Sequence, residues 1–109
     1  QKAINHFIKA VKYDPKNLNY LYHLTNLKEE ILDLHLKKSI NKLIKSKSLS
    51  KNNLAYGNLL LSKYEFYNGN YKKEFDYLIE GHKFFFESQY KSFENSLKYL
   101  NKLLIKIEL

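Results

Sequence analysis

Histidine, serine and acidic side chains are the groups in this chain that could support acid–base, nucleophilic or metal chemistry. No two histidines lie three or four residues apart, the spacing that would place two ligands on one helix face, and the 109 residues include no cysteine. The serines lie outside any nucleophile-elbow motif, and the three glycines form no phosphate-binding loop. The acidic pairs Glu29–Glu30 and Glu74–Asp76 lie beside lysines, which indicates solvated faces. We therefore predict no catalytic, metal or cofactor site, including at the histidines His6, His23, His35 and His82.

The charge of the chain comes from lysine. All nineteen basic residues are lysine, the net charge is +8, and residues 34 to 64 contain seven lysines and no acidic residue. Lys38, Lys42 and Lys45 fall on one stripe of an expected helix, so residues 37 to 63 could bind nucleic acid or an acidic partner. Arginine, which phosphate and base recognition favour, is absent. This basic surface is therefore the alternative interpretation, and nucleic acid is not the partner we favour.

Apolar residues recur at intervals of three and four along most of the chain, which predicts an all-α fold. Asp14 and Pro15 end a first helix over residues 2 to 13, and Asn17 and Ser50 are suited to cap later helices. Gly69 marks a turn before a helix over residues 71 to 85. A separate last helix follows, and we expect it to dock on the preceding helix pair, giving about six helices in all.

Ala3, Phe7, Ala10 and Pro15 have the small, large, small and proline spacing that resembles the closing half of a tetratricopeptide repeat. The resemblance implies antiparallel helix pairs stacked as a short right-handed superhelix. Because no opening half precedes Ala3, we expect a chain that begins in mid-repeat and is a piece of a longer protein.

A second copy of the pattern lies 71 positions later, where Glu74, Leu78 and Gly81 follow the turn. Glu74 departs from the alanine that the repeat family has at this position. The resemblance implies that small residues allow close helix crossings and that large residues fill the gaps. The residues assigned to packing within the repeats are Ala3, Phe7, Ala10, Pro15, Leu21, Leu24, Leu61, Ser62, Gly69, Tyr71, Leu78 and Gly81.

A narrower resemblance covers residues 17 to 90. The segments HLTNLKEEILD, LHLKKSINKLIKSKSLS and NLLLSKYEFYNGNYKKEFDYLIEGH are similar to the N-terminal repeat region of bacterial sulfotransferases that carry tetratricopeptide repeats. This likeness implies a non-catalytic region that precedes a catalytic domain, whose phosphosulfate-binding loop and base would lie beyond Leu109.

The resemblance divides the chain into the end of one repeat (residues 1 to 17), a degenerate repeat (18 to 51), a repeat (52 to 86) and a capping or linking helix (87 to 109). It also implies a binding groove lined by the first helix of each pair. The expected partner is a protein, a peptide or a C-terminal domain of the same parent chain, in the cytoplasm and away from membranes. The expected groove residues are Asn19, Tyr22, Asn26, Tyr56, Lys63, Phe66 and Tyr67.

Overall fold

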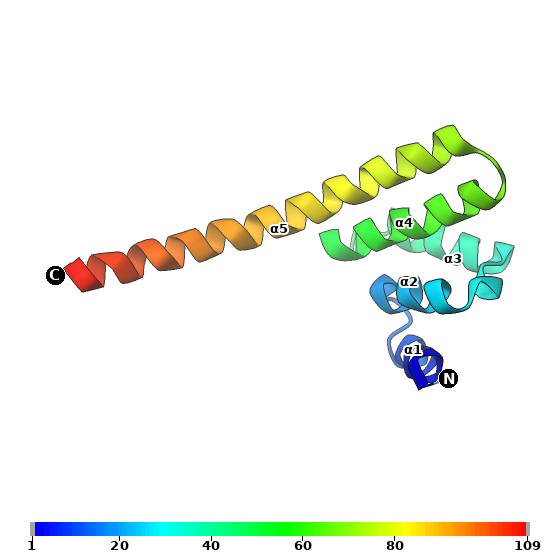
Figure 1. The fold of residues 1–109 in the computed structure, drawn as a ribbon, viewed down its shortest axis with the longest axis horizontal. Coiled ribbons are helices and arrows are strands. Elements are labelled where there is room, and N and C mark those ends of the chain that lie inside the picture. The colour runs from blue at the N-terminus through cyan, green and yellow to red at the C-terminus, as the bar shows by residue number, and fades with distance from the viewer. Residues whose placement is uncertain (1, 109) are drawn as a thin grey trace.

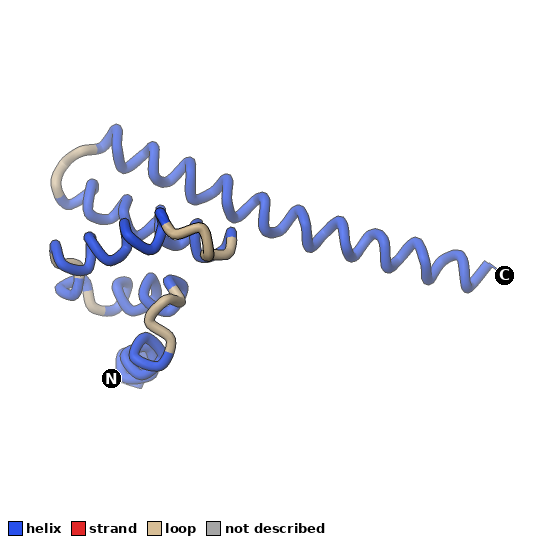
Figure 2. The backbone as a smooth tube through the Cα atoms, turned by 180° about the vertical axis from the view of Figure 1, so that it is seen from behind, coloured by secondary structure: helices blue, strands red, loops and turns tan. Residues whose placement is uncertain are grey.

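The computed structural model describes residues 2 to 108, which are helical apart from short connections (Figures 1 and 2). No β-strand occurs within this range, which confirms the all-α class. A short 3-10 turn, η1 (Glu29–Ile31), lies between the second and third α-helices. The α-helices are α1 (Lys2–Tyr13), α2 (Leu18–Leu27), α3 (Leu34–Lys45), α4 (Lys51–Tyr67) and α5 (Tyr71–Glu108).

Side chains at the helix starts explain where three of the helices begin. Asn17 accepts a hydrogen bond from the backbone N–H of Asn19 at the start of α2, and Ser50 caps α4 through the N–H of Asn53. Both caps were predicted from the sequence. Asp33 caps α3 in the same way, with its carboxylate 2.8 Å from the N–H of Leu36. Each cap satisfies a backbone donor that the helix itself leaves unpaired.

The α4 helix is the centre of the fold, because it packs against α2, α3 and α5. Its buried residues lie on several sides rather than on one stripe, as expected for a helix with neighbours on several faces. The buried core joins α2, α3 and α4, with Leu36, Leu43 and Ile44 of α3 packed around its margin. Its members are Leu18, Leu21, Ile40, Leu60, Leu61 and Tyr64.

Contacts across the core fix the directions of the helices. The starts of α2 and α4 meet where the N–H of Leu18 donates to Asn53, so these two helices run parallel. The start of α3 lies near the end of α4, because the hydroxyl of Tyr64 donates to the carbonyl of Asp33. The α5 helix returns antiparallel to α4 after a turn at Gly69, whose φ of 74° is in the left-handed region that favours glycine.

The α5 helix corrects two expectations. It is a single helix of 38 residues, whereas the sequence pattern predicted two helices that meet near residue 86. The cause is the absence of glycine or proline between residues 82 and 108, so nothing stops the helix. The second half of α5 does not dock on the preceding pair but extends away from the bundle (Figure 1), and all side chains from 89 to 107 are exposed. Residues 2 to 108 thus form five α-helices rather than about six.

The residues assigned to repeat packing differ in their burial. Leu21, Leu24, Leu61, Ser62 and Gly81 are buried, and Phe7, Ala10 and Leu78 are half-buried. Ala3, Pro15, Gly69 and Tyr71 are exposed.

Two small residues of the repeat pattern, Ala3 and Gly81, differ in whether a second helix packs against them. Ala3 lies at no buried crossing, because no helix covers its side of α1 among the described residues. Gly81 does lie at a close crossing, since a Cβ atom there would be 3.1 Å from Leu59 Cδ2 and 3.2 Å from the carbonyl oxygen of Ala55. Gly57 lies at a second such approach, against Ile44.

Candidate functional site

The expected groove residues all lie on α2 and α4, the two parallel helices. Tyr22 and Tyr56 lie side by side, with ring centroids 5.5 Å apart. Further along both helices, Lys63 reaches Asn26. The structure therefore brings residues of the two predicted halves together along one face, and we call this face the α2–α4 groove.

Lys63 is the central polar group of the α2–α4 groove. Its ammonium donates to Thr25 Oγ1 at 2.7 Å and to Asn26 Oδ1, and it lies 4.6 Å from the ring centroid of Tyr22. Thr25 is fully buried, and its hydroxyl donates in turn to the carbonyl of Tyr22 at 2.7 Å. The network holds the lysine in one position without an acidic ion-pair partner among residues 2 to 108.

The surroundings of Lys63 disfavour its charge. Burial lowers the pKa of Lys63 below 10.5, and the nearby carboxylate of Glu29 offsets part of that effect. A partly desolvated cation with hydrogen bonds to neutral groups alone is suited to receive an anionic or carbonyl oxygen from a ligand.

One end of the groove is a row of aromatic rings that crosses four helices. Phe7 of α1 stacks on His23 of α2 at 5.6 Å, His23 lies 6.1 Å from Tyr56 of α4, and Tyr56 meets Phe85 of α5 edge-on at 5.0 Å. Such contacts fix the positions of the rings.

The other end is a hollow of about 330 Å³ beside Lys63. Phe66 and Tyr67 are about half exposed there, at 52% and 53%. The neighbouring carboxylate of Glu29 raises the pKa of Tyr67 above its usual value. The residues around this hollow are Thr25, Asn26, Glu29, Ser62, Lys63, Phe66, Tyr67 and Glu74.

Several groove residues were not predicted from the sequence. Thr25 carries no motif, and its role follows from complete burial between α2 and α4. Glu29 and Glu74 had been assigned to solvated acidic pairs, but both border the hollow. Asn19 was predicted, and its Oδ1 atom is buried without a hydrogen-bond partner among the described residues. The helical period of α2 could have identified Thr25, which lies one turn from Leu21.

The predicted basic patch lies on α3, away from the groove residues of α2 and α4. Lys38, Lys42 and Lys45 are exposed, and none of the ion pairs in residues 2 to 108 involves them. Their neighbour Lys37 instead lies 3.7 Å from the buried carboxylate of Glu65 and 5.7 Å from the ring centroid of Tyr64. Lys37 therefore contributes to α3–α4 packing, while the other three lysines form a solvated stripe.

Residues 2 to 108 lack two further features. They contain no group of three histidine or acidic residues placed to hold a metal ion. None of their helices combines the length and apolar character that a membrane crossing requires.

Comparison of the chain with models of known protein families, with curated proteins and with solved structures finds no match.

Proposed function

We propose that this chain is a non-catalytic helical-repeat domain that binds an extended peptide segment of a partner protein in the α2–α4 groove. The observation that carries the proposal is the Lys63 cluster. An amide, a buried hydroxyl and an aromatic ring position one ammonium that has no acidic partner within the described residues. A peptide carboxylate or carbonyl would complete that coordination.

Helix directions support a tetratricopeptide-like arrangement. In such a stack the first helices of neighbouring repeats run parallel and line one face, which agrees with α2 and α4. The second helices, α3 and α5, run antiparallel to α4, and Gly81 allows α5 to approach closely. The aromatic row next to the lysine adds contact area for apolar side chains of the ligand.

The likeness to the repeat region of bacterial sulfotransferases implies a role for the domain within a longer parent chain. In that role the domain would position a partner or substrate protein for a catalytic domain of the same chain in the cytoplasm.

The proposal can be tested by NMR with an isotope-labelled chain and a pool of random peptides that have free C-terminal carboxylates. We expect shift changes at Tyr22, Asn26 and Lys63, and their loss in Lys63→Met. The matched control is Lys38→Met, which removes an exposed lysine outside the groove and should leave the changes intact.

The same experiment with a random-sequence DNA duplex tests the alternative of a basic surface. The basic-surface alternative predicts DNA binding that maps to α3 and weakens steeply with salt. This binding should disappear when Lys38, Lys42 and Lys45 are changed to Glu. Such a result, together with no shifts from the peptide pool, would contradict the peptide-binding proposal. Binding of this kind leaves the groove resonances unchanged, so the two outcomes are distinct.

A further inference from the structure

The second half of α5 carries an apolar stripe that nothing in the described chain covers. The stripe follows steps of four and three residues, which place all its members on one face of a helix. We call this face the α5 seam. Its members are Phe86, Tyr90, Phe93, Leu97, Leu100, Leu104 and Ile107, with exposures between 45% and 73%.

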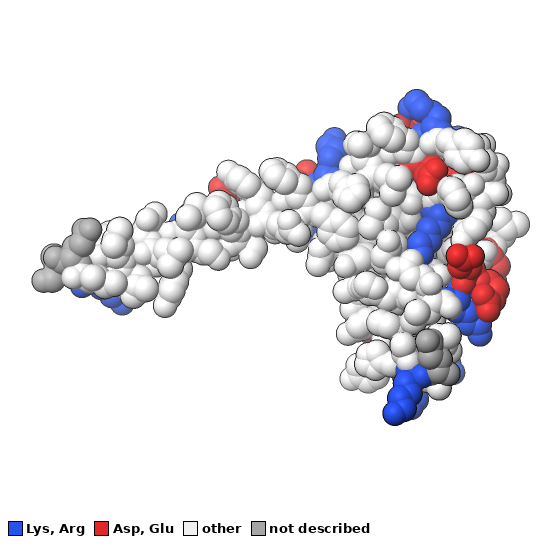
Figure 3. Space-filling view, viewed as in Figure 1, with Lys and Arg blue, Asp and Glu red and all other residues white. Residues whose placement is uncertain are grey.

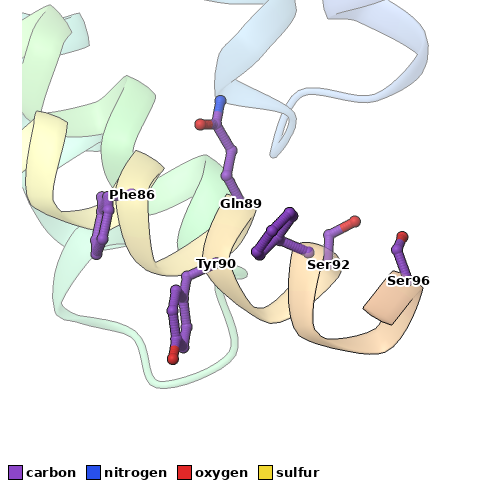
Figure 4. A pocket seen from close by; sticks show the side chains of 6 residues that line it. Phe86, Gln89, Tyr90, Ser92 and Ser96 are labelled. Carbon is purple, nitrogen blue, oxygen red and sulfur yellow. The ribbon is translucent and has the colours of Figure 1, made fainter. Parts of the chain in front are cut away.

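The α5 seam begins where α5 leaves the bundle. Near this point Lys51 of α4 forms an ion pair with Glu87 of α5 at 2.9 Å. Phe86 and Tyr90, on either side of Glu87 in the sequence, form a stacked pair with ring centroids 6.0 Å apart. Figure 4 shows both rings on one side of the helix, while Gln89 projects in a different direction.

A single helix of this kind gains little stability by itself. An isolated stretch of about 20 residues without tertiary packing is marginal in water. Its exposed apolar area also exceeds what a monomer usually leaves uncovered, since seven side chains at roughly 100 Å² each give about 700 Å². That area is close to the about 800 Å² that each partner buries in a stable protein–protein interface.

Charge is arranged so that two seams can meet. Lys91, Lys98, Lys102 and Lys106 lie on the opposite face of the helix, and no lysine lies within the seam from 86 to 107. Figure 3 shows the arm of α5 largely without charged atoms on the visible face, while charged atoms gather over the helical bundle. Glu94 borders the seam, which disfavours an anionic membrane as the covering surface.

We propose that the α5 seam pairs with the seam of a second copy of this chain in an antiparallel coiled coil. The bundle determines the direction, because residues 2 to 85 contain fifteen lysines and eight acidic residues. Two bundles with the same positive charge repel each other, and antiparallel helices keep them at opposite ends of the pair.

The sequence also fits one antiparallel register. Tyr90 faces Ile107 of the second copy, Phe93 faces Leu104, and Leu97 faces Leu100, so each aromatic ring meets an aliphatic side chain. At the border, Glu94 faces Asn101 rather than a second acidic residue. The tip of each seam then ends beside Tyr90, where the partner's bundle begins.

Because the chain lacks cysteine, cross-linking can test both the pairing and its direction. We expect analytical ultracentrifugation to detect a dimer. Tyr90→Cys mixed with Ile107→Cys should give the mixed disulfide under mild oxidation. Tyr90→Cys alone should not, because antiparallel pairing places the two copies of residue 90 roughly 25 Å apart at 1.5 Å per residue.

Charge substitutions provide the matched comparison. Leu97→Glu with Leu100→Glu should raise the dissociation constant by tenfold or more and lower helicity by circular dichroism. Lys98→Glu with Lys102→Glu, on the opposite face of the same helix, should leave the dimer intact. Peptide shifts in the α2–α4 groove should persist in both variants, so failure of this proposal is distinguishable from failure of the proposed function.

Three results would overturn the pairing. A monomer at hundreds of micromolar would exclude the dimer, and efficient self-linking of Tyr90→Cys would exclude the antiparallel direction. The third result concerns a chain that stays monomeric and binds vesicles of anionic phospholipid. If Leu97→Glu with Leu100→Glu abolishes that binding, the seam contacts a membrane surface instead.

Discussion

The backbone N–H of Leu18 donates to Asn53 Oδ1 at 3.0 Å, so a side chain in the first turn of α4 caps the first turn of α2. The two residues are 35 positions apart, and the same Asn53 is held by its own N–H, which donates to Ser50. Leu18 is fully buried, and its N–H has no partner within α2 because it lies in the first turn. This bond therefore joins the starts of the two groove helices and fixes their register.

Asn53→Ala should lower the free energy of unfolding by about 1 to 2 kcal/mol, because it leaves a buried backbone donor unpaired. Asn52→Ala is the matched control, since Asn52 is the exposed neighbour in the same turn. Asn53→Asp keeps the acceptor and should retain most of the stability. Chemical denaturation measures all three, and equal losses for Asn52→Ala and Asn53→Ala would contradict the assigned role.

A bulky residue in place of Gly81 should destabilise the α4–α5 crossing. The Cβ atom of any other residue would approach Leu59 and the Ala55 carbonyl at 3.1 to 3.3 Å, so we expect Gly81→Leu to cost about 1 to 3 kcal/mol. Glu80→Leu places the same side chain on the exposed neighbouring position and should change stability much less. Ala3→Leu should be nearly neutral as well, because Ala3 is exposed. A Gly81→Leu melting temperature equal to that of Glu80→Leu would contradict the crossing.

Local sequence signals predicted the caps at Asn17 and Ser50 and the turn at Gly69, because each depends on residues within a few positions. The resemblance to tetratricopeptide repeats implied that Tyr22, Tyr56 and Lys63 line one groove, and the structure places them on one face of α2 and α4. The cap of Leu18 by Asn53 could not be predicted, since it depends on how two helices meet. The continuity of α5 was missed because the stripe after Phe86 was expected to need a partner within the chain.

Thr25 and Lys63 should be energetically coupled. The buried hydroxyl accepts from the ammonium at 2.7 Å, so Thr25→Val removes a bond that Lys63→Met also removes. We expect a double-mutant cycle on the free energy of unfolding to give a coupling of about 0.5 to 1.5 kcal/mol. A cycle of Thr25→Val with Lys38→Met is the control and should be additive, since Lys38 is exposed on α3. Additivity in both cycles would show that the Lys63 contact is absent in solution.

Stability should fall between pH 10 and pH 12 partly because of Tyr64. Burial, with a smaller effect from the Asp33 charge, raises the pKa of Tyr64 from 10.0 to about 12. The unfolded chain therefore loses this proton first as pH rises. The stabilisation is fully present below pH 10 and is lost as pH approaches 12.

Tyr64→Phe removes the ionisable group, together with the hydrogen bond to the carbonyl of Asp33. We expect it to lower stability at pH 7 but to reduce the further loss between pH 10 and pH 12. Tyr13→Phe is the control, because Tyr13 is 93% exposed and should leave both quantities unchanged. Urea denaturation at pH 7, 10 and 12 measures the difference. Parallel pH dependence of the Tyr64→Phe variant and the parent chain would mean that Tyr64 is as solvated when folded as when unfolded.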